Sequence, residues 1–518
     1  MVRLPSIDLS RVTGRPTSRR KLLAGSAALA VAPWSSRLPT VRAQDGAMER
    51  HVGLDGEPTN LDATSPSEDL TQYASSQQIF DSLLTYSYDG TMSVEPNLIE
   101  TWTWEDSQTF AFTLRSGVKF HDGREMTAED VKFTIDHIKD PANGSSIASF
   151  VEPIEAVDIV DARSGVIRLA YPFAPLETYV LQKIFVVPQE HMDTIKTSPV
   201  GSGPFRYVEW RKGESLTLEK NPDYWQTGKP LIDRLVFQFF PQYQTQVSSF
   251  KSGDTDIILW LNNADADPFK QEEGVRIEEM GLFGNFYVHI NVTRDPWTNL
   301  KLREAIKYGV DKQLVLNTAQ LGFGSTVDIN ELPDSPFYTP DFNYQRDDER
   351  ARALILESGV GDITDDLVIP NTPTEGPIGE AVAFSLNELG MNITPLKLDV
   401  PQYIDRAFVK KDYGIGIVGY GGVPDPDFYD YPYLHSDGSL NIFNYSNPDM
   451  DAALEKGRSS TSLDDRKAAY YTVIQRMAED IPMVWLINEY RFTAVRSSVE
   501  GFRWNRSKVY SYLDATKS

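Results

Sequence analysis

One stretch of sequence, FTLRSGVKFHDG at residues 112–123, decides the fold of the first half of the chain. Together with residues 109–111 before it, its first part predicts a strand, because Phe110, Phe112 and Leu114 occupy alternate positions and would share one face of a sheet. Its second part predicts turns, since Gly117 follows a Ser and a second glycine closes the stretch. The stretch therefore reads as a half-buried strand that leads into a turn-rich connection.

The sequence around this stretch predicts a sheet-rich first half. A helix over 128–139 follows it, because Thr127 can accept hydrogen bonds from the free N–H groups of the first turn. Further strands are predicted over 166–171, 215–219 and 234–240. Glycines are expected where turns need a positive φ, and these are Gly117, Gly123, Gly201 and Gly203.

The second half changes to alternating helices and strands, which predicts a parallel sheet and an α/β lobe. A βαβ unit is the clearest part: a strand over 366–369, a helix ending at Leu389–Gly390 and a strand over 391–399. The other predicted helices cover 302–316, 347–358, 402–410 and 463–480, and the other predicted strands cover 413–420 and 481–487.

The N-terminal segment differs sharply in charge from the rest. Residues 1–43 carry +7, which leaves −31 for the remainder of a chain whose net charge is −24. The pair Arg19-Arg20 precedes an apolar run over 22–32, which is too short to span a bilayer. Small residues near Ala43 complete the pattern of a cleaved export signal, similar to a twin-arginine signal. We expect 1–43 to be removed and the mature protein to be periplasmic, soluble and not lipidated.

The composition excludes several classes of protein. The acidic balance argues against nucleic acid and anionic membranes as partners, because both attract basic surfaces. The chain has no cysteine, so disulfides, zinc–thiolate sites and iron–sulfur clusters are excluded. At 518 residues the chain exceeds what one hydrophobic core usually serves, and two or more lobes are expected.

The motifs of catalysis and cofactor binding are missing. The sequence has no Gly-x-Ser-x-Gly elbow, no Walker loop, no His-Glu-x-x-His and no Gly-x-Gly-x-x-Gly that opens a helix. Acids gather at Asp425, Asp427 and Asp430, and again at Asp265 and Asp267, without the spacing of a calcium loop. We expect these to be solvated loop acids, and we expect no catalytic residue, no metal and no cofactor.

Several blocks, in order from about residue 57 to 502, resemble family 5 of the extracellular solute-binding proteins, the peptide- and nickel-binding group of ABC importers. The most specific are the opening stretch and the TAEDV that follows it at 127–131. The other blocks are EPTNLD at 57–62, IFDSLL at 79–84, EPNLIETW at 95–102, GSGPF at 201–205, NPDYW at 221–225, Asn291, LREA at 302–305 and Asp311-Lys312.

The resemblance implies an α/β periplasmic-binding-protein fold of the large class, with two lobes and a hinge that the chain crosses twice. The first lobe would comprise 44–282 plus 488–518, with an inserted subdomain near 88–195, and the second 283–487. The implied function is capture of peptides or related small solutes by hinge closure, followed by delivery to a permease and its ATPase subunits. A monomer without enzymatic activity is expected. The alternatives are an oligosaccharide or glycoside binder on this scaffold, and a secreted hydrolase or chaperone-like protein.

The ligand is expected where the strand over 413–420 ends, because ligands bind at the carboxyl ends of strands in open α/β sheets. Glycines there allow close approach of the backbone. The candidate ligand-binding residues, most of them by family position, are Ser65, Ser67, Glu68, Trp260, Asn262, Asn263, Phe283, Asn285, Tyr420, Gly421, Gly422, Asp425, Trp485, Asn488 and Glu489.

One departure from the family pattern bears on the ligand. Peptide-binding relatives carry an Asp in this segment, before a Pro-Asp-Pro part, that pairs with the ligand's α-amine. Here the stretch over 420–423 has no acid, and Asp425 belongs to the Pro-Asp-Pro part. A sugar-like, amidic or modified ligand becomes more plausible, unless Glu68 or Glu489 takes over that role.

Overall fold

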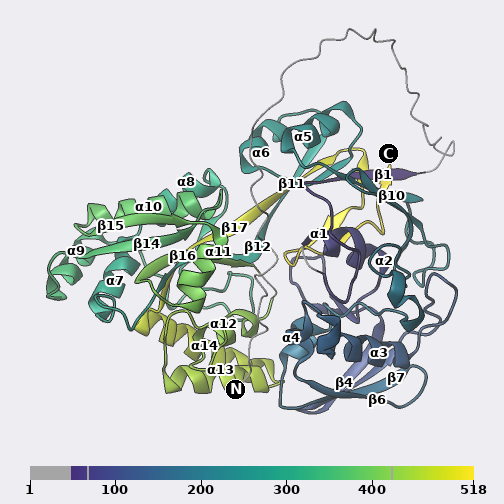
Figure 1. Ribbon diagram of the computed structural model, residues 1–518, viewed down its shortest axis with the longest axis horizontal. Coiled ribbons are helices and arrows are strands. Elements are labelled where there is room, and N and C mark those ends of the chain that lie inside the picture. The colour runs from purple at the N-terminus through teal and green to yellow at the C-terminus, as the bar shows by residue number, and fades with distance from the viewer. Residues whose placement is uncertain (1–47, 67–68, 422–423, 518) are drawn as a thin grey trace, which may run out of the picture. The chain divides into compact units, whose positions relative to one another are not determined.

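The largest sheet in the described residues has eleven strands and runs through both halves of the chain (Figure 1). The computed structural model describes residues 48–66, 69–421 and 424–517. The sheet order is β15-β14-β16-β12-β17-β11-β1-β10-β9-β8, with β13 beside β17. The bounds are β1 Glu49–Leu54, β8 Phe205–Arg211, β9 Ser215–Lys220, β10 Arg234–Phe239, β11 Ile257–Leu261, β12 Val275–Ile290, β13 Ser325–Thr326, β14 Thr364–Pro370, β15 Asn392–Leu398, β16 Ile415–Gly421 and β17 Met483–Arg496.

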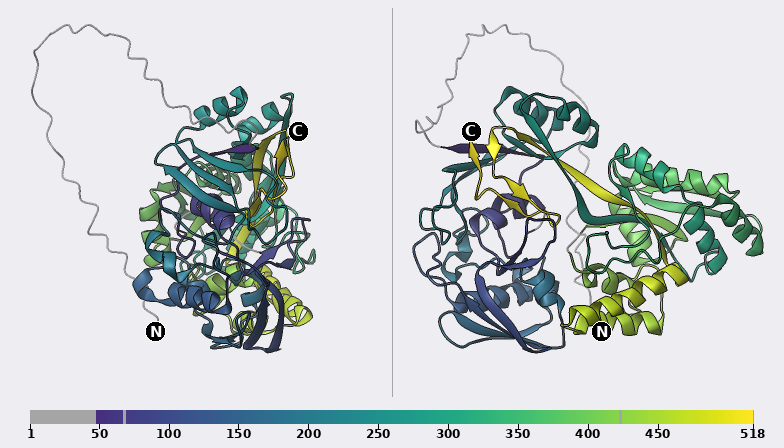
Figure 2. Two further views of the ribbon diagram at one scale, coloured as in Figure 1. Left: turned by 90° about the vertical axis from the view of Figure 1, so that its right-hand side faces the viewer. Right: turned by 180° about the vertical axis from the view of Figure 1, so that it is seen from behind.

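The long strands β12 and β17 connect the two ends of this sheet, and they run side by side in both views of Figure 2. Their antiparallel pairing breaks register between Gly281 and Asn285. On one side of the break β17 also pairs with β11, and on the other side β12 pairs with β16. The register shift thus separates the part of β17 that pairs with β11 from the part of β12 that pairs with β16.

A separate four-stranded sheet lies in the first half, in the order β4-β5-β7-β6. Helix α3 packs on it, and Phe110, Phe112 and Leu114 point into their shared core as predicted. The predicted helix over 128–139 is confirmed to the residue. The bounds in this region are β2 Leu84–Tyr86, β3 Val94–Pro96, β4 Ile99–Asp106, β5 Thr109–Leu114, α3 Ala128–Lys139, α4 Ala148–Val151, β6 Ile154–Ile159 and β7 Ser164–Leu169.

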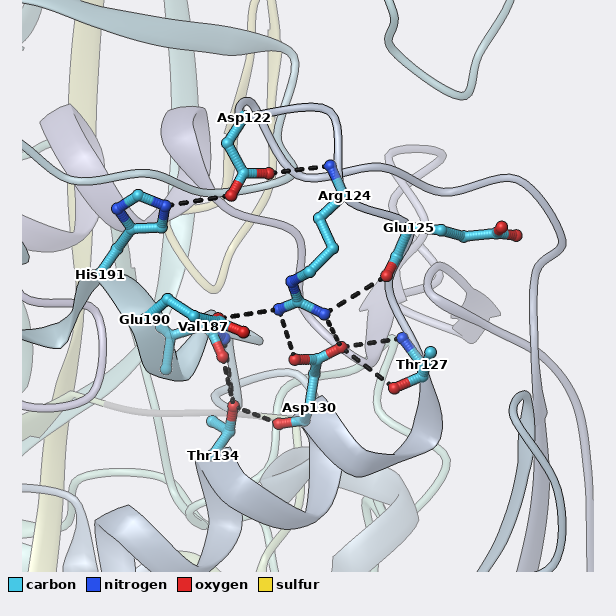
Figure 3. Close-up of polar contacts among 9 residues, drawn as sticks. All are labelled: Asp122, Arg124, Glu125, Thr127, Asp130, Thr134, Val187, Glu190 and His191. Carbon is cyan, nitrogen blue, oxygen red and sulfur yellow. Dashed lines mark hydrogen bonds and ion pairs between the residues drawn. The ribbon is translucent and has the colours of Figure 1, made fainter.

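The polar residues of the stretch over 112–131 hold α3 in place (Figure 3). Thr127 and Asp130 form a reciprocal capping box at the N-terminus of α3. Arg124 donates to both oxygens of Asp130, at 2.7 and 3.1 Å, and reaches Glu190 at 3.2 Å. Asp122 accepts from His191 at 3.0 Å in the tautomer that donates from Nε2. These contacts stabilise the junction between turn and helix.

The glycine prediction is right for one pair and wrong for the other. Gly117 and Gly123 have φ values of +71° and +94°, as expected for turns. Gly201 and Gly203 do not have positive φ; they are needed because the backbone at Ile79 lies against them. A Cβ on Gly201 would stand 2.0 Å from the carbonyl oxygen of Ile79. Close packing of two backbones therefore requires these two glycines.

The second half is an α/β arrangement, as predicted. Strands β14 and β15 are parallel and joined by α10, and β14 is parallel to β16. Alternate residues of β14 enter different cores: Leu367 and Ile369 pack against α10, and Val368 packs with Tyr403 of α11. The helices here are α7 Leu300–Gly309, α8 Lys312–Gln320, α9 Asp348–Glu357, α10 Glu375–Glu388, α11 Val400–Ile404, α12 Asp427–Leu434, α13 Pro448–Ser459 and α14 Leu463–Asp480.

The helix predicted over 302–316 is in fact two helices. Val310 is extended, with φ −70° and ψ 125°, and it ends α7. Asp311 then accepts a hydrogen bond from the N–H of Leu314 at 2.9 Å and starts α8. The spacing of apolar residues continues from α7 into α8 because both helices bury residues in the same core. The remaining elements are α1 Asp69–Thr71, α2 Gln77–Ile79, α5 Tyr243–Ser252, α6 Asn263–Lys270, β18 Val499–Glu500, β19 Arg503–Trp504, β20 Tyr510–Ser511 and β21 Thr516–Lys517.

Three of the blocks that carry the family resemblance meet at one buried carboxylate. Asp81 lies in the first of them, and its oxygens accept from Tyr224 at 3.0 Å, Ser202 at 3.1 Å and Trp225 at 3.3 Å. Burial raises the pKa of Asp81 to about 7, in spite of these donors. The blocks are thus joined by packing within the first half of the chain.

This buried acid predicts a pH dependence of stability. Between its ordinary pKa of 3.8 and about 7, folded Asp81 keeps a proton that the unfolded chain has lost. Its contribution to stability therefore falls as the pH rises through this range and is level above it. We expect the difference in unfolding free energy, Asp81→Asn minus wild type, to rise by about 1 kcal/mol per pH unit between pH 5 and 7.

Urea unfolding at pH 5, 6 and 7 measures this difference. The matched control is Asp158→Asn on β6, an acid that is half exposed and paired with Arg168 on the surface. Its difference from wild type is expected to stay level over the same range. A level difference for Asp81→Asn as well would mean that Asp81 is ionised throughout.

Candidate functional site

A cavity of about 520 Å³ lies where residues of the first half meet the region that follows β16. The first half contributes residues from α4 and from the connection after β7. The second half contributes Gly421 at the end of β16 and residues of α12 and α13. The lining residues are Ser149, Phe150, Glu152, Pro153, Tyr171, Phe173, Tyr179, Gly421, Asp427, Phe428, Tyr429, Pro432, Tyr433, Ser439, Leu440 and Arg458.

Aromatic rings from both halves form a continuous wall of this cavity. Phe428 of α12 packs edge-on against Tyr179, with ring centroids 5.5 Å apart, and lies 5.8 Å from Phe150. Phe173 and Tyr171 extend the wall at 6.4 and 6.2 Å. Edge-to-face packing fixes the directions of these rings, so the wall is preorganised.

One ion pair borders the cavity. Asp427 accepts from Nε and Nη2 of Arg458 at 2.9 and 3.0 Å, a bidentate arrangement. The Arg458 guanidinium also lies 3.2 Å from the centroid of the Tyr431 ring. Burial raises the pKa of Asp427, while Arg458 lowers it. Each charge is satisfied by the other and by the protein around it.

Further carboxylates lie behind the wall and are buried. Asp425 accepts from Nη2 of Arg466 at 2.8 Å and from the hydroxyl of Thr178. Asp430 accepts from the amide of Asn330 at 2.9 and 3.0 Å. Burial raises the pKa of Asp430 well above its usual range, with Glu331 as the next cause. The prediction that the acids of this segment are solvated loop residues is wrong, because all three are buried and each accepts hydrogen bonds from a protein side chain.

The two halves also bond to each other directly beside the cavity. The N–H of Ala174 donates to the carbonyl oxygen of Arg458 at 2.8 Å. Thr178, in the π-helical turn Leu176–Val180, donates to Asp425. The cavity is therefore bounded by contacts that hold residues of α12 and α13 against the first half.

The candidate residues from the sequence fall into several places. Gly421 lines the cavity. Ser65 accepts from the N–H of Ser146 at 3.1 Å, three residues before the lining residue Ser149. Ser67, Glu68 and Gly422 lie outside the described residues, and so the substitute role of Glu68 is not addressed.

Trp260, Asn262 and Asn263 lie at the end of β11 and the start of α6, apart from the cavity lining. Trp260 packs edge-on against Tyr73 at 5.4 Å, and the guanidinium of Arg491 lies 5.3 Å from its ring. Asn262 is the N-cap residue of α6, and its N–H donates to Tyr243. The amide of Asn263 donates to Gln320 at 2.5 Å.

The candidates on β12 and β17 meet at the register break. The amide of Asn488 donates to the carbonyls of Leu282 and Gly284 at 2.8 and 2.7 Å, and to Asn285 at 3.0 Å. Asn285 in turn donates to the carbonyl of Asn330. These buried amides join the two strands where the ladder is interrupted.

The other candidates on these strands differ in their surroundings. Trp485 is buried in a hydrophobic core, with its ring 5.0 Å from Tyr287. Glu489 pairs with Arg491 at 2.7 Å. Tyr420 and Phe283 lie on β16 and β12. Neither Trp485 nor Glu489 is among the described residues that line the cavity, and the side chains of Tyr420 and Phe283 lie outside what the structure describes.

Sequence reasoning missed most of the cavity wall. Phe150, Tyr179, Phe428 and Arg458 come from segments that carry no recognisable motif. The one available signal was the aromatic density of 427–433, DFYDYPY, directly after the predicted ligand segment.

The chain is similar to proteins of a known family. The profile of "Bacterial extracellular solute-binding proteins, family 5 Middle" matches residues 93–441, more than half of the chain. The chain belongs to this family. As a family 5 member it is an extracellular solute-binding protein, which confirms the resemblance noted in the sequence.

Relatives extend the similarity beyond the profile. Heme-binding protein A of Haemophilus influenzae is 27% identical over 474 residues, which is 84% of this chain and 86% of that protein. The dipeptide-binding protein of Escherichia coli is 26% identical over 487 residues, 86% and 90% of the two chains. Both relatives are named for what they bind, heme in one and a dipeptide in the other.

Solved structures establish the fold. HbpA2 from Haemophilus parasuis superimposes with a TM-score of 0.84 at 21% identity, over 91% of this chain and all of that one. The family 5 chain thus has the two-lobed α/β fold of periplasmic binding proteins. Within the described residues, no helix combines the length and the apolar character that a membrane crossing requires.

Proposed function

We propose that this family 5 protein is the periplasmic binding component of an ABC importer for peptides or related small solutes. One observation carries the proposal: the cavity beside Gly421 takes its walls from both halves of the chain. A ligand held there contacts both halves at once, and so it stabilises the closed arrangement relative to an open one. Its volume of about 520 Å³ lies in the range of small-molecule sites.

Hinge closure follows from the same geometry. The first lobe in this proposal is 44–282 plus 488–518, with the inserted subdomain near 88–195, and the second lobe is 283–487. Both crossings fall at the register break between β12 and β17, where Asn285 lies opposite Asn488. Closure would create the contacts that bound the cavity, Ala174 to Arg458 and Thr178 to Asp425.

Export and delivery complete the proposal. Residues 1–43 act as a twin-arginine-like signal and are cleaved, so the mature monomer is periplasmic and carries no lipid. It hands its ligand to a membrane permease that is driven by ATPase subunits, and it does not alter the ligand. N-terminal sequencing of periplasmic protein is expected to start after residue 43, and an intact Met1 would reject the export proposal.

The ligand class is tested by native mass spectrometry of the purified mature protein, followed by calorimetry. Di- and tripeptides are expected to bind with a 1:1 stoichiometry and to be recovered unaltered. An oligosaccharide set tests the glycoside alternative, and hemin is included because one relative is named for heme. Binding of oligosaccharides or hemin without any peptide binding would replace the proposed ligand class, and a chemically altered ligand would replace the transport role.

A further inference from the structure

The cavity has a chemical character that goes beyond its place between the lobes. Seven of its sixteen lining residues are aromatic, and Pro153, Pro432 and Leu440 add apolar surface. Phe150 and Phe428 are only partly buried although they belong to the ring cluster, so each presents part of its ring to the cavity. An apolar wall of this kind favours an apolar occupant, because removing apolar surface from contact with water lowers the free energy.

The charges along the wall are already engaged. Both oxygens of Asp427 accept from Arg458, and the Arg458 guanidinium is also stacked on Tyr431. Glu152 is exposed and accepts from the hydroxyl of Tyr171 at 2.7 Å. A ligand amine or carboxylate that bound Asp427 or Arg458 would have to break this pair, and the released partner would remain partly buried without its counter-charge.

The neighbouring acids offer no substitute. Asp425 is held by Arg466, Thr178 and the N–H of Asp427, and Asp430 is held by Asn330. In the described part of this wall, every ionised side chain therefore has a protein partner. The missing acid in the stretch over 420–423 points the same way.

The cavity is large enough for an aromatic side chain of a ligand together with part of the ligand's main chain. A dry cavity of about 150 Å³ accommodates a benzene-sized ring. The cavity of about 520 Å³ thus leaves room for the main chain of a ligand beside Gly421, which has no side chain of its own.

We propose that this cavity is a specificity subsite for a large uncharged side chain of the ligand, aromatic or branched aliphatic, and that it excludes charged ones. The inference rests on the proposed function and deepens it: the solutes carried are peptides or amides with bulky apolar side chains. Phe150 and Phe428 are the specificity-determining residues, because they come from the two lobes, pack against each other at 5.8 Å and both line the cavity with partly exposed rings.

Calorimetry with homotripeptides of Phe, Leu, Ala, Glu and Lys tests this subsite without a choice of register. Wild-type protein is expected to bind the Phe and Leu peptides about tenfold or more tighter than the Ala, Glu and Lys peptides. Equal affinities across the set, or a preference for Glu or Lys, would overturn the inference while leaving the proposed peptide function in place.

Substitutions in the cavity test whether it is the source of the preference for apolar side chains. Phe428→Ala and Phe150→Ala are expected to reduce the Phe-to-Ala affinity ratio about fivefold or more, with little change for the Ala peptide. The matched control is Phe384→Ala, which removes an exposed ring of α10 outside the cavity and should leave the ratio unchanged. A ratio that survives both cavity variants would place the selectivity elsewhere and overturn the inference.

A separate probe covers failure of the proposed function itself. If no tripeptide binds, N-acetyl-tryptophanamide, an uncharged aromatic amide, is titrated instead. Binding that is lost in Phe428→Ala and kept in Phe384→Ala would support the subsite on a protein that does not carry peptides. Absence of binding to wild type would overturn the subsite together with the function.

Discussion

Arg466→Met is expected to lower the free energy of unfolding by about 3–5 kcal/mol at neutral pH. Arg466 is almost fully buried on α14, and its Nη2 donates to Asp425, which is buried as well. Removing the guanidinium leaves the Asp425 carboxylate in a low-dielectric environment, where its remaining donors among the described residues are the hydroxyl of Thr178 and the N–H of Asp427. Desolvation of that unpaired charge, rather than loss of attraction, accounts for most of the effect.

A matched control lies on the same helix. Arg476 is more exposed, and its partners Asp449 and Glu479 are largely in solvent, so Arg476→Met should cost less than about 1 kcal/mol. The double variant Arg466→Met/Asp425→Asn should recover part of the loss, since residue 425 then carries no unpaired charge. Urea unfolding followed by circular dichroism measures all three. Equal losses for Arg466→Met and Arg476→Met would contradict the argument.

Gly201→Ala is expected to destabilise the first half by about 3 kcal/mol, near the upper end of overpacking effects. The added Cβ would stand 2.0 Å from the carbonyl oxygen of Ile79, which also accepts the N–H of Gly203 at 2.8 Å. Backbone cannot rotate away as a flexible side chain can. Relief therefore requires the segment before Asp81 to move and to disturb the donors that surround this acid.

The control for this substitution is Gly361→Ala. A Cβ there meets no atom within 4 Å, so the change should stay within about 0.5 kcal/mol. If Gly201→Ala does not accumulate as folded protein, the ratio of soluble yields of the two variants replaces the unfolding curves. Equal stability of the two variants would show that the contact with Ile79 relaxes at little cost.

Local regularities made much of the fold predictable. Alternation of Phe110, Phe112 and Leu114 and the cap at Thr127 indicated a strand and a helix, and both are present. The βαβ unit around α10 was predicted for the same reason. Apolar residues recur every 2 positions in a strand and every 3.6 in a helix, and this spacing can be recognised within a short segment of sequence. The error over 302–316 shows the limit, because two helices that share one core carry one continuous apolar stripe.

The candidate site was predictable only in part. Gly421 was found because the end of a strand in an α/β sheet is a position that topology makes favourable for ligands. Phe150 and Arg458 were not found, because each belongs to a local structure that looks ordinary by itself. Their role depends on which element lies opposite, and no short-range pattern encodes that.

By itself, the sequence determined the family, the order of helices and strands, and the lack of an acid over 420–423, because each depends on residues close together in the chain. Tertiary structure alone decided which groups are desolvated and what faces them. Asp425 and Asp427 looked like solvated loop acids until Arg466 and Arg458, some 30 to 40 residues away, were seen to neutralise them. Burial and partnership are properties of packing, and packing joins residues that the chain keeps apart.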